Sequence, residues 1–448
     1  MQFFNRSLTV LALRSVLISA SLSILPSSVA AAHDGAEHAV VGLDRAQELR
    51  LESDIKFLSQ RLGHDSADLA LLGKKAELEL KLARHRGEHE DYEASEASFR
   101  KLGAQRESAG SLVGLAYSLI GQHEFAEALA TARSAASLRP ESVEVRALLG
   151  DLHFALGNYA EAEMIYELLV SSELNLSSLS RLAEIKEQRG LFSEAQALYD
   201  DAIEAGELLQ ASPSAIAWCK TIAGDLAAQL GDLARAESYY GQALRLDPGA
   251  HATLFRMARV ERSEGEHELA LALLTRLVED YPRPAYWTEL GDVLFEIGRK
   301  TEAAKYFDLA RTDMEQDLSK SDFGHLRELA EFYLSHDGDA KKAVELAEQD
   351  LAEIRRDSGA YETLAWAHFR SGDSHAALAP LRAALRSGPS SVRLLCRAAL
   401  ILESAGEVEQ ASQLRGRVQT LNPTLRQTHG EDSREAFAAF ERMATHGY

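Results

Sequence analysis

The sequence has few of the residues that hold disulfide-bonded, zinc-binding or β-rich proteins together. Its 448 residues include only two cysteines, Cys219 and Cys396, which lie far apart in the chain. They form neither a CxxC pair nor a zinc pattern, so we interpret both as small apolar core residues. Proline is scarce, at nine residues, and Ala, Leu, Glu and Arg dominate. This composition favours helix over sheet.

Basic residues are also scarce relative to acidic ones. Lys and Arg total 48 against 69 Asp and Glu, which gives a formal net charge of -21. Such a surface repels nucleic acid and anionic lipid, so we expect no nucleic-acid partner and favour a basic one. No P-loop, GxSxG elbow or Rossmann fingerprint occurs at a usable place. We therefore expect no enzymatic activity and no cofactor.

Long apolar runs are missing after the first thirty residues, which argues against a membrane-spanning helix. The first thirty residues combine Arg6 and Arg14, no acid, the short apolar stretch SVLISASLSIL and the small-residue segment PSSVAAA. This layout predicts a cleaved signal peptide over residues 1–32 and an exported protein, with the periplasm as the preferred destination and the extracellular space as the alternative. Residues 33–42 would then form a flexible mature N terminus.

What the sequence does contain is an internal period. In the segment WTELGDVLFEIGRKTEAAKYFDLA, which spans residues 287–310, the reference position is Ala303. Its counterparts recur at steps of 33 or 34 residues, except for two steps of 40 and 41 that exceed the others by about two helical turns. The aligned residues are Ser95, Ala128, Ala162, Ala195, Ala236, Ala270, Ala303, Ala343, Ala377 and Ala411.

Each period reads as a helix, a short turn at a glycine and a second helix. Two helices that cross closely tolerate only Gly or Ala at the crossing, so Gly291, Ala303 and Ala310 should touch while Phe307 fills the hollow beside them. Gly298 permits the turn at little steric cost. A single helical pair cannot bury its own apolar face, and neighbouring pairs must stack.

The pattern Trp-x-x-Leu-Gly followed by Gly, Ala, Phe and Ala resembles the tetratricopeptide repeat. The resemblance covers residues 67–423, about ten units, of which the first is degenerate and the eighth imperfect. It implies an all-α fold, a right-handed superhelix with a concave groove, and a scaffold that binds a protein or peptide. Residues 43–66 are predicted to form an additional N-terminal helix, and residues 424–448 a C-terminal capping helix or tail.

In this family the groove is lined mainly by the first helix of each pair. An aromatic floor with acidic walls would suit an extended, partly basic peptide. The alternative is that the aromatic residues belong to the core, because a phase error of one residue rotates a side chain by about 100°. The aromatic candidates are Phe154, Trp218, Phe255, Phe295, Trp366 and Phe369, and the acidic ones are Glu144, Asp151, Glu184, Asp225 and Asp292.

Two further groups of residues suggest ligands. Arg256, Arg259 and Arg262 stand three apart on one first helix, where they could hold a carboxylate or phosphate, or pair with acidic residues of adjacent repeats. If the signal is cut after Ala30, the terminal amine, two backbone amides and the imidazole of His33 would suit Cu(II) or Ni(II). This predicts a metal-handling protein as the alternative function, and other cleavage positions would remove the site.

Overall fold

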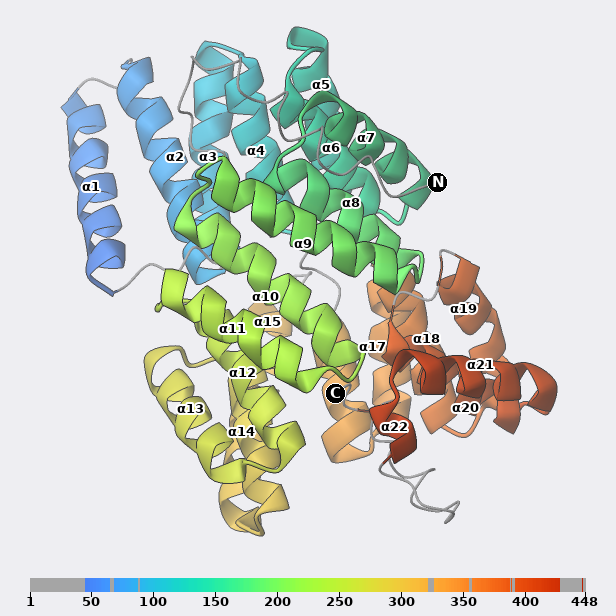
Figure 1. Ribbon diagram of the computed structural model, residues 1–448. Helices are drawn as coiled ribbons and strands as arrows, with labels where there is room; N and C mark the ends of the chain where they lie inside the picture. Colours follow the sequence, from blue (N-terminus) through green and yellow to red (C-terminus); the bar gives the residue numbers. More distant parts are fainter. Residues whose placement is uncertain are drawn as a thin grey trace.

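The computed structural model describes residues 45–64, 68–87, 89–320, 326–353, 357–386, 388, 391–427 and 445. These residues are helical or lie in short connections, and none of them is in a strand (Figure 1). The predicted signal peptide, the segment 33–42 with His33, and most of the predicted C-terminal segment lie outside them. The all-α fold class is confirmed. None of the described helices is long and apolar enough to cross a membrane.

The helices pair in chain order into ten hairpins, which we number repeats 1 to 10. Helix α1 (Arg45–His64) precedes them and the short α22 (Thr424–Gln427) follows. The pairs are α2 (Leu69–Arg86) with α3 (His89–Gln105), α4 (Ala109–Gly121) with α5 (Phe125–Leu138), α6 (Val143–Ala155) with α7 (Tyr159–Ser172), α8 (Leu176–Gln188) with α9 (Phe192–Leu208), α10 (Pro213–Gln229) with α11 (Leu233–Leu246), α12 (His251–Glu264) with α13 (His267–Asp280), α14 (Pro284–Glu296) with α15 (Lys300–Lys320), α16 (Leu326–Phe332) with α17 (Ala340–Glu353), α18 (Ser358–Arg370) with α19 (Ser374–Arg386), and α20 (Val392–Ser404) with α21 (Val408–Leu421).

Local sequence explains where the hairpins begin and turn. Most first helices start at polar caps such as Ser142 and Ser391, whose side chains accept hydrogen bonds from backbone amides of the first helical turn. Nine of the ten turns within repeats hold a glycine in the left-handed region, as Gly298 does at φ 84°. Repeat 2 uses His123, at φ 61°. The predicted turn at Gly298 is confirmed.

The aligned small residues form the contact between the two helices of each pair. All ten of them, from Ser95 to Ala411, are buried, with no more than 1% of any residue exposed. A Cβ placed on Gly291 would lie 2.5 Å from Phe307 Cε1, so only glycine allows that ring to pack there. The two long steps are absorbed by longer helices: α9 and α10 have 17 residues each and α15 has 21.

The stack of repeats curls until its two halves meet along a seam. We call repeats 1–5 the first superhelical turn and repeats 6–10 the second. In the first half, the turn between the two helices of a repeat lies against the segment that follows another repeat, five places further along the chain. The turn of repeat 1, for example, lies against the segment between repeats 6 and 7. The contacts that show this register are Arg283 Nη2 to the Arg86 carbonyl (2.9 Å), the Ser358 amide to Tyr159 Oη (3.3 Å), a Cβ on Gly388 to the Gln188 carbonyl (2.5 Å), and Asn422 Nδ2 to the Gln229 carbonyl (3.2 Å).

Apolar side chains also cross the seam. Leu230, in the turn of repeat 5, and Leu421, at the end of repeat 10, each pack against both the core of repeats 4–5 and the core of repeats 7–10. Figure 1 shows the orange and red helices α18 to α22 beside the green helices α9 to α11. The superhelix is therefore closed on itself laterally, and a partner on the inner face reaches it from the ends.

Candidate functional site

The first helices of neighbouring repeats contact one another more extensively than the second helices do, so they form the inner, concave face. One position of this face lies eleven residues before each aligned small residue. In repeats 3 to 7 it holds a charged residue and in repeats 8 and 9 an aromatic one, so the face changes character along its length. These residues are Asp151, Glu184, Asp225, Arg259, Asp292, Phe332 and Trp366.

Most of the charges on the inner face pair between adjacent first helices. Asp151 accepts two hydrogen bonds from the guanidinium of Arg181, at 2.7 and 2.9 Å. Arg256 Nε lies 2.7 Å from an oxygen of Asp225. Both ion pairs are held within the repeat array, so the acid of each pair is already neutralised.

The three arginines of α12 follow the same rule. Arg262 reaches Asp292 at 3.1 Å and Glu289 at 2.6 Å, and Arg259 lies 3.4 Å from Glu289. The pairing of Arg256, Arg259 and Arg262 with adjacent repeats is therefore confirmed. A carboxylate or phosphate ligand would have to compete with these bonds.

Tyrosines of the second helices support two of the inner carboxylates. Tyr166 Oη donates to Asp151 at 3.0 Å, and Tyr240 Oη donates to Asp225 at 2.7 Å. Both tyrosines stand four residues after the aligned alanine of their repeat. Burial, together with the neighbouring carboxylate, raises the pKa of Tyr166 well above its ordinary value, which keeps the hydroxyl protonated as a donor.

Glu184 is the exception among these acids. Its side chain is partly exposed, and it makes no hydrogen bond or ion pair to another residue that the structure describes. Desolvation, followed by the charges of Asp151 and Glu187, raises its pKa well above the ordinary value against the opposing effect of Arg181. The surrounding repeats enclose the inner face. Solvent therefore reaches this carboxyl group but hydrates it poorly.

The predicted aromatic residues fall into different environments. Phe154 and Trp366 are 2% and 1% exposed and lie in hydrophobic core clusters, as the core alternative expects. Trp366 is stacked on Phe369, with ring centroids 5.0 Å apart. Phe369 remains partly exposed, as do Trp218 and Phe255, whereas Phe295 is 52% exposed. A partner can reach the last four directly, and whether it binds them stays a prediction.

Sequence reasoning missed a polar cluster around repeat 8. His336 lies in a π-helical turn, Tyr333–Asp337, that continues α16, and its Nε2 is 2.9 Å from Asp292. Its ring packs between Phe332 and Phe307, at centroid distances of 4.8 and 4.6 Å. The departure of repeat 8 from the repeat pattern was the available signal, but it did not indicate which residues would meet there.

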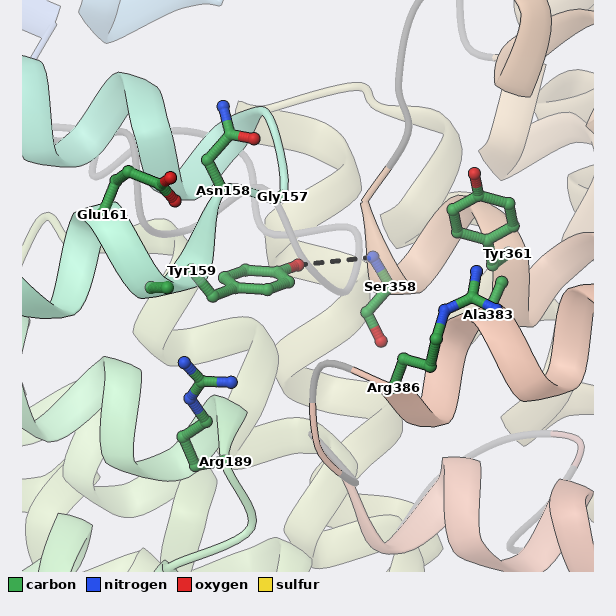
Figure 2. Close-up of a pocket in the computed structure, with 10 residues that line it drawn as sticks. Gly157, Asn158, Tyr159, Glu161, Arg189, Ser358, Tyr361, Ala383 and Arg386 are labelled. Carbon is green, nitrogen blue, oxygen red and sulfur yellow. Dashed lines mark hydrogen bonds between the residues drawn. The ribbon is translucent and has the colours of Figure 1, made fainter.

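A cavity of about 370 Å³ opens at the seam (Figure 2). Tyr159, at the start of α7, reaches toward Ser358, while Arg189 and Arg386 line the cavity from the two superhelical turns. Arg189 is held by Glu163, with Nη2 and Oε2 3.2 Å apart. The cavity is a gap between the two halves and is separate from the charged rows of the inner face.

The residues that the structure describes contain no group of three or more His, Cys, Asp or Glu placed to hold a metal ion. Cys219 and Cys396 are both free and buried. Burial raises the pKa of the Cys219 thiol to about 12, which keeps it unreactive. The predicted Cu(II) or Ni(II) site depends on His33, so nothing in the described part of the chain supports the metal-handling alternative.

Comparison with known proteins identifies the repeat. Family models of the tetratricopeptide repeat match residues 119–175, 181–251, 223–282, 255–317 and 362–414. Curated proteins yield no match.

Among solved structures, the chain is similar to the APC/C hetero-tetramer Cut9-Hcn1, with 17% identity and a TM-score of 0.44 over 75% of this chain and 63% of that one. It is also similar to the human IFIT1 dimer with m7Gppp-AAAA, with 17% identity and a TM-score of 0.47 over 71% of each chain. A tetratricopeptide repeat protein from Parabacteroides merdae aligns with 15% identity and a TM-score of 0.33 over 66% of this chain and 99% of that one. The chain thus spans less than two thirds of the first of these structures.

Proposed function

Because the chain belongs to the tetratricopeptide repeat family, we propose that it is a non-enzymatic scaffold that binds an extended, partly basic peptide on its inner face. The signal-like first thirty residues support a place in the periplasm or cell envelope. In this proposal the binding surface consists of the charged rows of repeats 3 to 7 and the accessible aromatic rings of the first helices.

The observation that carries the proposal is the unpaired carboxyl group of Glu184. Asp151, Asp225 and Asp292 are neutralised by arginines of this chain, so a cation from a partner gains little beside them. Glu184 makes no such ion pair among the described residues, and its raised pKa reflects desolvation and the charges of Asp151 and Glu187, which the charge of Arg181 offsets only in part. A Lys or Arg of a bound peptide would offset these effects and gain a poorly screened ion pair.

The aromatic residues that remain accessible supply contact area for the rest of the peptide. Trp218 and Phe255 stand on the first helices of the two repeats that follow Glu184, and Phe369 stands in repeat 9. Rings at such intervals can pack against alternate side chains or the backbone of an extended segment. Phe154 and Trp366 act through the core, where they hold the first helices in place.

The test uses two fluorescein-labelled peptides, one alternating Lys with Leu and one alternating Glu with Leu, titrated by anisotropy. The proposal expects the Lys peptide to bind and the Glu peptide not to bind. Glu184→Gln should weaken binding of the Lys peptide by roughly tenfold or more, the loss of about 1.4 kcal/mol. Glu194→Gln, an exposed carboxylate on the outer helix α9, is the matched control.

Equal affinity for the two peptides, or unchanged binding in Glu184→Gln, would overturn the role of this face. To find the natural partner, wild type and Trp218→Ala can be compared by affinity purification from the native envelope. A partner that depends on the inner face should be lost from the Trp218→Ala sample and retained with the Glu194→Gln control.

A further inference from the structure

The seam uses one edge from each superhelical turn and leaves two matching edges uncovered. The turn edge consists of the turns within repeats, and the connection edge consists of the segments between repeats. In the seam, the turn edge of repeats 1–5 is covered by the connection edge of repeats 6–10. The turn edge of repeats 6–10 and the connection edge of repeats 1–5 therefore remain at opposite ends of the superhelix.

The glycines of the turns show which edge is covered. A Cβ on Gly231, in repeat 5, would clash with Asn422 across the seam. In the second superhelical turn, no described atom comes within 4 Å of such a Cβ at any of the five turn glycines. These are Gly265, Gly298, Gly338, Gly372 and Gly406. The turn glycine is thus closely packed across the seam in repeat 5 and open in all five repeats of the second half.

On the connection edge, the leucines at the ends of second helices show the same difference between the two halves. Leu421 stands ten residues after its aligned alanine and packs across the seam. Leu138 occupies the same position in repeat 2 and is 50% exposed. Leu246 occupies it in repeat 5 and is also exposed. Three further exposed leucines lie beside them on the same edge: Leu174, Leu208 and Leu209.

The uncovered turn edge has apolar residues that match these leucines. Leu230, which packs at the seam, stands six residues before its aligned alanine, and the residue at that position in repeat 7 is Ile297. Beside it, Phe295 exposes half of its surface. The register of the seam joins repeat n to the repeat five places later. Repeat 7 would therefore meet repeat 2 of another chain, which brings Ile297 and Phe295 to Leu138.

Because the two free edges match the two edges that pack in the seam, we propose that a second copy of the chain docks on the first head to tail. The turn edge of repeats 6–10 in one copy packs on the connection edge of repeats 1–5 in the next, and the intramolecular seam is continued between molecules. Exposed apolar residues gathered on two complementary edges are typical of such an interface. Because the two edges differ, the contact is heterologous and each added copy presents a new free edge. The two edges do not include the charged rows of the inner face, so this inference does not rest on the proposed peptide binding.

The test measures the mass of the full mature chain by sedimentation velocity over a range of concentrations. Wild type should grow beyond a dimer as concentration rises. Leu138→Glu and Phe295→Glu should each raise the concentration needed for association by about tenfold or more, because each puts a charge into an apolar contact. Met164→Glu is the matched control, since Met164 is 64% exposed but lies on α7 away from both edges. Circular dichroism checks that all variants remain helical.

A mixing experiment distinguishes head-to-tail docking from a symmetric dimer. Leu138→Glu keeps an intact turn edge and Phe295→Glu keeps an intact connection edge, so differently labelled samples of the two should form a one-to-one complex that grows no further. A wild type that stays monomeric at every concentration would overturn the proposal. So would a dimer that neither variant weakens, or the absence of a mixed complex.

Discussion

Arg397 of α20 donates to both carboxylate oxygens of Glu331 in α16, two repeats earlier, at 2.8 and 2.7 Å. Glu331 stands twelve residues before the aligned Ala343, at a position where the other nine repeats have Gly or Ala. Arg397 is fully buried and also reaches Glu362 at 3.1 Å. The π-helical turn that ends the first helix of repeat 8 adds one residue, so the fully buried Ala330 keeps the place of the small residue at the helix crossing and Glu331 follows it into the ionic cluster.

Replacing Arg397 with Met should destabilise the protein strongly. Burial by itself would raise the pKa of Glu331, but the charge and hydrogen bonds of Arg397 lower it to about 2. Without Arg397 the buried carboxylate of Glu331 loses its bidentate partner and Glu362 keeps Arg393 at 3.3 Å, and the loss of the buried pair costs about 3–5 kcal/mol. Urea denaturation at neutral pH measures this. Arg311→Met is the control, because Arg311 pairs at the surface and its loss should cost less than about 1 kcal/mol.

Gly291→Ala should destabilise repeat 7 by about 1–3 kcal/mol, because the added methyl group meets the Phe307 ring. Combining it with Phe307→Leu should cost less than the sum of the two single changes, since the smaller side chain makes room. Gly416→Ala, in α21 with no neighbour within 4 Å, is the matched control and should stabilise by about 0.5–1 kcal/mol. Thermal denaturation of the four variants gives the comparison, and equal effects at Gly291 and Gly416 would contradict the packing account.

Glu184→Gln should raise the melting temperature at pH 8. The folded-state pKa of Glu184 is raised, so the folded state holds this proton more tightly than the unfolded state does. That contribution is fully present below the unfolded pKa near 4.5 and is lost as pH rises through the folded pKa. The advantage of the variant should therefore shrink as pH falls toward 4. A variant less stable than wild type at pH 8 would show that Glu184 is stabilising as a charged group.

His251→Gln should flatten the loss of stability between pH 6.5 and pH 4. Desolvation and nearby cations lower the pKa of His251 to about 3, and its Nδ1 lies 2.5 Å from Tyr286 Oη. Below the unfolded pKa near 6.5, His251 binds a proton in the unfolded state but not in the folded state. The free energy of unfolding of the wild type therefore falls by up to about 1.4 kcal/mol per pH unit. Denaturation curves at several pH values measure the slope. The exposed His375→Gln should leave it unchanged.

The arrangement of the inner face was only partly predictable. Alignment placed Asp151, Asp225 and Asp292 on that face, and the pairing of the α12 arginines with adjacent repeats was one of two alternatives stated. Which acid would be left without a partner depends on the side chains that neighbouring repeats bring within reach. Phe154 and Phe295 occupy equivalent positions in their repeats, yet one is buried and the other exposed, because different neighbours cover them.

The sequence by itself determined the repeat. Contacts between the helices of a pair, and between adjacent pairs, involve residues close in the chain, so the period, the buried alanines and the turn glycines could be predicted from spacing alone. Only the tertiary structure decided how the repeats close on themselves. A small rotation at each repeat accumulates over five of them and brings Gln229 to Asn422. No local pattern encodes that sum, nor does any encode the buried partnership of Glu331 with Arg397.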